Sequence, residues 1–160
     1  MSIPVVNSGV NVDLLHPEMK NRLRKFFADP RIKGKVAVVS GVRTLAQQRY
    51  LYNGYKAGKR GFNLAANPDR KFGGGFQGSW HMQQPALGHY GYAVDFRIVG
   101  KGISTTQVNA IAKEYGIVKT VPSEWWHHQC YGHLGGGKYG WYPVQGQKKK
   151  PADPKKIKQD

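Results

Sequence analysis

Histidine and carboxylate side chains gather in one stretch of this 160-residue chain. Five of its six His lie between residues 81 and 133, alongside Asp95 and Glu124. Imidazole and carboxylate groups bind Zn²⁺, and a catalytic zinc takes three protein ligands and leaves one position for water. A nearby carboxylate then accepts a proton from that water. The stretch supplies such a set, with His81, Asp95 and His127 as candidate ligands and Glu124 as candidate general base.

Four short motifs surround these residues in a fixed order. They are Ser40-Gly-Val-Arg43 with Gln48 after it, Ser79-Trp-His81, Gly91-Tyr-Ala93-Val-Asp95, and Glu124-Trp-Trp-His127. The series resembles the zinc D-Ala-D-Ala carboxypeptidase and L-alanyl-D-glutamate endopeptidase family, whose members include cell-wall peptidases, vancomycin-resistance dipeptidases and phage endolysins. The resemblance runs from about residue 12 to 131. Four motifs in order make it far more specific than any one of them.

The resemblance implies a role for each of these residues. His81, Asp95 and His127 correspond to zinc ligands, and Glu124 corresponds to the general base. Arg43 corresponds to a cation that binds substrate and stabilises the developing oxyanion, because a guanidinium presents a planar fork to carboxylate or carbonyl oxygens. Further candidates for substrate binding are Ser79, Gln48, His89 and Trp126.

The first metal ligand has two candidates. Family members usually space this His and the Asp by seven residues, whereas His81 and Asp95 are fourteen apart, so residues 82–89 resemble an insertion. His81 keeps the local Ser-x-His motif and is the preferred ligand. His89 lies six residues before Asp95, and residues six apart share a face of a strand, so His89 remains the alternative.

Periodicity predicts the elements that must position these side chains. Apolar residues at helical spacing predict helices over residues 13–29, 44–57 and 104–115. Short apolar runs predict strands at 36–40, 91–99, 117–118 and 125–130. The Gly-rich stretch 58–80 predicts a functional or mobile loop without regular structure. Together with the resemblance, these elements indicate an α+β fold, a small antiparallel sheet with packed helices and a zinc cleft on the sheet face.

The second helix has the clearest local signals. Thr44 is its expected N-cap, with Gln47 completing a capping box. Leu51, Tyr52 and Tyr55 give it an apolar and aromatic face.

The charge of the chain indicates an anionic partner. Lys and Arg number 25 against nine Asp and Glu, a formal net charge of +16. Nucleic acid or the phosphate polymers of a bacterial wall fit such a charge. Residues 147–160 hold six Lys and two Asp and predict a basic disordered tail or linker, which leaves residues 1–146 as the peptidase domain.

The same composition excludes several classes of protein. One Cys rules out a disulfide framework and a Cys-rich zinc site. No apolar stretch suits a membrane span, so we expect no membrane insertion, and the start lacks the pattern of a signal peptide. We expect a monomer that is made in the host cytoplasm and acts on the cell wall after release.

These observations converge on one expected function. We expect a zinc-dependent peptidase that hydrolyses peptidoglycan stem peptides, of the phage endolysin, L-alanyl-D-glutamate endopeptidase type. Cleavage of a D-Ala-D-Ala or cross-bridge bond is the alternative within the class. A basic, non-catalytic wall-binding or nucleic-acid-binding module is the alternative from another class. Nucleic acid is not an expected partner, because such a module does not account for the His, Asp and Glu spacing.

Overall fold

The computed structural model describes residues 2–73 and 75–130 of the chain. Four of its strands form an antiparallel sheet in the order β1-β4-β6-β5, and two more form a separate antiparallel pair. This confirms the predicted α+β class. The elements are α1 (Pro17–Ala28), β1 (Val36–Ser40), α2 (Leu45–Lys56), β2 (Lys71–Gly73), β3 (Phe76–Gln77), β4 (Val94–Ile98), α3 (Thr105–Glu114), β5 (Ile117–Lys119) and β6 (His127–Cys130).

The two faces of the four-stranded sheet differ because side chains alternate along a strand. On β4, the buried Phe96 ring stacks on Phe26 of α1, with 5.2 Å between ring centroids. On β6, His128 stacks on Phe96 at 4.3 Å. The alternate residues Asp95 and His127 point to the opposite face and are paired in register across β4 and β6. The sheet therefore has its hydrophobic core on one face and two candidate metal ligands on the other.

Capping boxes open both α2, where the sequence predicts one, and α3. The Thr44 hydroxyl accepts from Gln47 N at 3.1 Å, and the Gln47 side chain accepts from Thr44 N at 2.8 Å. Ser104 and Gln107 make the same two hydrogen bonds at the start of α3. These reciprocal bonds satisfy N–H groups that have no partner inside a helix, so the helix starts are encoded locally.

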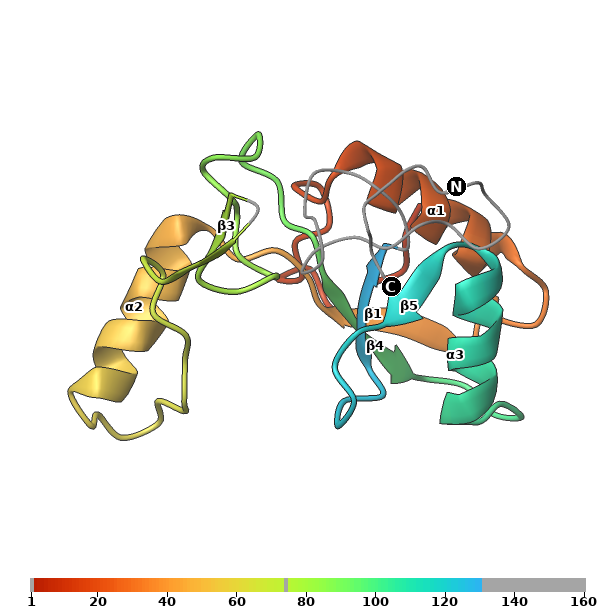
Figure 1. The fold of residues 1–160 in the computed structure, drawn as a ribbon. Coiled ribbons are helices and arrows are strands. Elements are labelled where there is room, and N and C mark those ends of the chain that lie inside the picture. Colours follow the sequence, from red (N-terminus) through yellow and green to blue (C-terminus); the bar gives the residue numbers. More distant parts are fainter. Residues whose placement is uncertain (1, 74, 131–160) are drawn as a thin grey trace.

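The helix α2 lies apart from the core, although its sequence suggested a packed apolar face. Leu51 and Tyr52 are only half-buried, and Tyr55 is exposed. The buried residues of α2 are Gln48 and Gly54. Figure 1 shows α2, in yellow, well away from the sheet and from α1 and α3. The helix is therefore available as a wall of a site.

The segments at 58–80 and 91–99 differ from their predicted structure. Residues 58–80 contain the paired strands β2 and β3, where only a loop was expected. The strand predicted at 91–99 begins only at Val94, because Gly91 is hydrogen-bonded to the chain before α1 through Leu14 O and His16 N. Pairing outside the sheet thus shortens β4 at its start.

The remaining expectations concern the chain ends and the membrane. The predicted domain limit at residue 146 and the basic tail 147–160 lie outside the described residues. Among the residues that the structure does describe, no helix is long and apolar enough to span a membrane.

The end of α1 is joined to the end of α3 by one carboxylate. α1 begins at Pro17, later than the predicted residue 13, and it ends at Ala28, with Asp29 as its C-cap. Asp29 accepts hydrogen bonds from the Arg31 side chain at 2.7 and 3.0 Å and from Tyr115 Oη at 2.7 Å. The bonds from Arg31, and then that from Tyr115, hold the pKa of the Asp29 carboxyl well below its ordinary value.

The Asp29 contacts predict an acid-dependent contribution to stability. We expect Tyr115→Phe to lower the free energy of unfolding by about 1.5–3 kcal/mol at pH 7, as for loss of a hydrogen bond to a charged group. A carboxyl with a lowered folded pKa stabilises the fold above its unfolded pKa of about 3.9 and loses this contribution as pH falls below it. Urea denaturation at pH 7 measures the effect of Tyr115→Phe. The pH dependence is tested by urea denaturation of wild type and Asp29→Asn at pH 7 and pH 3. The free energies of unfolding of these two proteins should differ less at pH 3 than at pH 7, and an unchanged difference would contradict the assignment.

Candidate functional site

Three side-chain atoms from three parts of the chain meet at one point. His81 Nε2 lies 3.1 Å from Asp95 Oδ1 and 3.3 Å from His127 Nδ1, and His127 Nδ1 lies 3.4 Å from Asp95 Oδ1. Zinc bonds of about 2.0–2.2 Å at tetrahedral angles place neighbouring ligand atoms about 3.3–3.6 Å apart. The triangle therefore has close to the size that a tetrahedral zinc requires, and it supplies three of the four ligands.

The protonation of these groups also suits a cation. His81 Nδ1 lies 3.0 Å from the Gly41 carbonyl, which can only accept, so the neutral ring carries its proton there and Nε2 offers a lone pair. Burial raises the pKa of the Asp95 carboxyl, but its contacts with His127 and His81 outweigh burial and keep that pKa well below its ordinary value. An ionised carboxylate thus lies beside a ring nitrogen of each histidine in a largely buried pocket, where a cation is favourable.

The loop that carries His81 is tied to the segment after β1. Arg43 N donates to His81 O at 2.9 Å, and His81 N donates to Ser79 Oγ at 3.2 Å. The carbonyl of Gly41 accepts the hydrogen bond from the His81 ring. This residue must be glycine, because a Cβ there would overlap the carbonyl oxygen of Asn11. The motif around residues 40–43 therefore positions the first ligand as well as Arg43.

Glu124 lies beside the triangle without belonging to it. Its Oε1 is 4.0 Å from His127 Nδ1, the ring atom that faces the cluster, and its side chain is 39% exposed. A tight turn places it, since Glu124 N donates to Val121 O and Glu124 O accepts from His127 N. A solvent-accessible carboxylate next to a metal site has the position that a general base requires.

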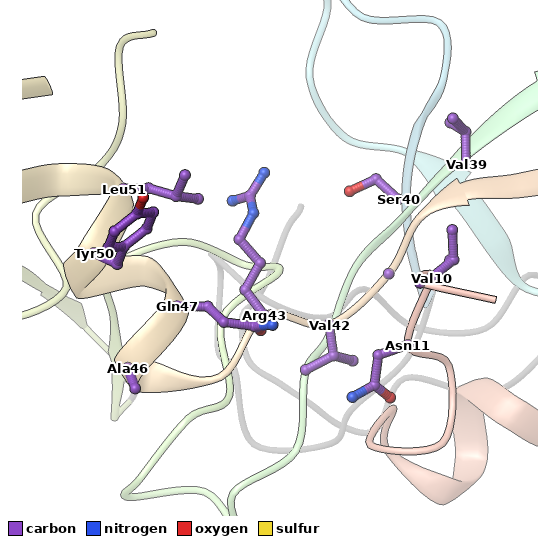
Figure 2. A pocket seen from close by; sticks show the side chains of 12 residues that line it. Val10, Asn11, Val39, Ser40, Val42, Arg43, Ala46, Gln47, Tyr50 and Leu51 are labelled. Carbon is purple, nitrogen blue, oxygen red and sulfur yellow. The ribbon is translucent and has the colours of Figure 1, made fainter. Parts of the chain in front are cut away.

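Arg43 projects into a cavity next to the cluster. Figure 2 shows its side chain extending from the segment after β1, with Leu51 of α2 on one side and Ser40 on the other. The cavity has a volume of about 530 Å³. Ser40, which helps to line it, is opposite Asp95 in the β1–β4 register. A second cavity of about 560 Å³ also contains Arg43 and Leu51 and is lined by residues 61–66.

The guanidinium group of Arg43 is hydrogen-bonded to an uncharged side chain. Its Nη1 donates to Gln48 Oε1 at 3.1 Å, and the buried Gln48 donates in turn to Ala66 O. Burial lowers the pKa of the guanidinium and attraction to Asp95 offsets part of this, so Arg43 stays a cation at neutral pH. Among the described residues, no carboxylate forms an ion pair with it. Its charge is therefore available to an anionic ligand.

The structure separates the two candidates for the first ligand. His81 belongs to the cluster, whereas His89 is exposed, lies outside it, and has a left-handed backbone with φ 63°. Trp126, next to the candidate ligand His127, is 37% exposed and can contact a bound molecule. The segment between His81 and Asp95 thus carries His89 away from the candidate metal ligands.

A residue that no sequence pattern marks organises the segment between His81 and Asp95. Gln84 is fully buried, and its Nε2 donates to the carbonyls of Gln77, Ser79 and Met82 at 2.8–3.0 Å. Its Oε1 accepts from Gln77 N. No periodicity or motif marks a single amide inside an irregular loop, so only the folded chain identifies it.

The chain was compared with known proteins. No family model and no curated protein matches it. The solved LdcB LD-carboxypeptidase is 16% identical over 83% of this chain, with a TM-score of 0.50. VanYB in complex with D-alanine-D-alanine is 18% identical, covers 81% of this chain and 84% of its own, and has a TM-score of 0.48. A mutant VanY D,D-pentapeptidase in complex with Zn(II) is 16% identical, covers 81% and 86%, and has a TM-score of 0.45.

The match to LdcB concerns the fold. This chain spans 65% of the LdcB chain, less than two thirds of it. The shared part includes the antiparallel sheet and helices described above, so the chain has the α+β fold of the LdcB LD-carboxypeptidase.

Proposed function

We propose that this protein is a zinc-dependent peptidase that hydrolyses the stem peptides of peptidoglycan. The triangle of His81, Asp95 and His127, which has the size and protonation that zinc requires, carries this proposal. Glu124 beside it and Arg43 in the adjacent cavity complete the set that the motifs imply. The fold also supports the proposal, because it is similar to that of LdcB, an LD-carboxypeptidase whose structure addresses peptidoglycan recognition.

The residues divide the reaction between them. Bound zinc supplies a Lewis acid for the scissile carbonyl and lowers the pKa of its water. Glu124 accepts a proton from the attacking water while the water oxygen bonds to the carbonyl carbon. It returns that proton to the amine nitrogen as the C–N bond breaks. Arg43 binds an anionic group of the substrate and orients the peptide.

Within this class, we propose an endolysin that cuts the L-alanyl-D-glutamate bond. Support comes from the motif resemblance, which includes phage members, and from Arg43, whose unpaired charge suits a carboxylate of the stem peptide. A D-Ala-D-Ala or cross-bridge bond remains the alternative.

The basic charge fits an enzyme that works on a wall. We propose that the net charge of +16 holds the protein on anionic wall polymers after its release from the host cytoplasm. Nucleic-acid binding accounts for the charge but leaves the metal triangle unexplained.

The triangle predicts one zinc ion per chain, held by His81 and not by His89. We expect His81→Asn to lose zinc on gel filtration because it removes one of three ligands, whereas His89→Asn keeps it. Asn suits both positions as a control, since it tolerates the left-handed backbone at residue 89. Metal analysis of the eluted proteins measures the zinc. Loss of zinc from His89→Asn with retention in His81→Asn would reverse the assignment.

The position of Glu124 predicts a loss of rate without a loss of metal. Glu124→Gln should lower the rate of peptidoglycan cleavage by about 10²–10⁴-fold, as for removal of a general base, with unchanged zinc content. Mass spectrometry of digested cell walls measures the rate, and the fragment masses name the bond. EDTA-treated wild type is the inactive reference. Full cleavage by the variant would refute this mechanism, and DNA binding with no wall cleavage by wild type would favour the nucleic-acid module.

The position of Arg43 predicts that catalysis depends on the planar geometry of its guanidinium group and not only on its positive charge. We expect Arg43→Lys to lower kcat/KM by about 10–100-fold, since a lysine cannot make two parallel hydrogen bonds. The matched control is Arg49→Lys, an exposed α2 residue that pairs with Asp69. Steady-state assays with a soluble stem peptide compare them. Equal effects of the two substitutions would show that Arg43 has no specific contact with substrate.

A further inference from the structure

His127 has a second polar contact, on the side of its ring away from the cluster. Its Nε2 lies 3.0 Å from Gln129 Oε1, and Thr120 Oγ1 lies 2.6 Å from the same oxygen. Gln129 is fully buried. Strand geometry explains the arrangement, because residues two apart on β6 share a face and Thr120 directly follows the neighbouring strand β5.

The two histidines of the triangle are held in different ways. His81 donates to a backbone carbonyl, so the main chain sets which of its nitrogens carries the proton. His127 instead faces a side-chain amide, which can present either its oxygen or its NH₂ group. With the oxygen toward it, His127 carries its proton on Nε2 and offers a lone pair at Nδ1. With the NH₂ group toward it, the proton moves to Nδ1, where the metal must bind.

The contact with Thr120 indicates which end of the amide faces the ring. Its length of 2.6 Å fits an O–H···O hydrogen bond, for which about 2.5–3.0 Å is usual. It is shorter than the range of about 2.7–3.2 Å for bonds between nitrogen and oxygen. The hydroxyl therefore donates to an oxygen, and the same oxygen accepts from His127 Nε2.

We infer that Gln129, oriented by Thr120, is a positioning residue that keeps the His127 proton on Nε2 and leaves Nδ1 open for the metal. The inference rests on the proposed zinc site. Gln129 holds the ring in the form that binds zinc and adds no charge to the cluster, where Asp95 is the one anion among the three candidate ligands. Outer hydrogen bonds of this kind orient ligands and tune their affinity.

The tautomer itself is the direct test. In metal-free protein at pH 8, the ¹⁵N shifts of the imidazole nitrogens distinguish a protonated from an unprotonated nitrogen. We expect the Nε2–H form of His127 in wild type and in Gln129→Glu, which retains an acceptor. Gln129→Met, similar in size but without an acceptor, should show a mixture or the Nδ1–H form. A wild-type protein with the proton on Nδ1 would overturn the inference.

Zinc affinity gives a second readout, measured by competition with a chromogenic chelator and no substrate. Gln129→Met should raise the zinc Kd by about 10–100-fold. Thr120→Val should raise it less, because the acceptor remains, and Gln129→Glu should bind zinc no more weakly than wild type.

A control on the opposite face of β6 separates positioning from general loosening of the strand. Asn109 of α3 contacts His128 Nε2 at 2.7 Å, and His128 points to the face of β6 opposite that of His127. Asn109→Ala should therefore lower stability while the zinc Kd stays close to the wild-type value. An equal loss of zinc affinity in Asn109→Ala and Gln129→Met would overturn the inference. If Gln129→Met fails to fold, an unchanged tautomer and Kd in Thr120→Val overturn it. A wild type that binds zinc but cuts no peptidoglycan would refute only the proposed function.

Discussion

The antiparallel pairing of β4 with β6 is the constraint on which the site depends. It places Asp95 opposite His127, and alternation along the same strands sends Phe96 and His128 into the core. A shift of either strand by one residue would exchange its two faces, so packing Phe96 against Phe26 also fixes which face carries the ligands. The hydrophobic core therefore secures the geometry of a polar site that lies on the other side of the sheet.

Neutral amides organise the charged groups around that geometry. Gln48 holds the Arg43 guanidinium, Gln84 holds the loop that carries His81, and Gln129 contacts the ring of His127. All three glutamines are buried, and each makes hydrogen bonds that offset the cost of burying it. Because an amide carries no charge, the positive charge of Arg43 and the lone pairs of the triangle remain available to a substrate and a cation.

The helix α2 lines the cavities around Arg43 and contributes little to the core. Its start is specified by a local capping box, yet its aromatic residues do not enter the core. Instead, Leu51 and Tyr50 line both cavities that contain Arg43. A helix that contributes little to the core can vary in its exposed residues without unfolding the sheet, which suits a wall that contacts substrate.

The sequence by itself determined the α+β class, the starts of α2 and α3, and the candidate set of His, Asp, Glu and Arg residues. Capping boxes, periodicity and short motifs are local, so they can be recognised without the fold. Only the tertiary structure placed His81 and not His89 beside Asp95, moved α2 away from the core, and gave Gln84 and Gln129 their contacts. Those outcomes depend on hydrogen bonds between distant segments, such as that from His81 to Gly41 forty residues away, and no local pattern encodes such a contact.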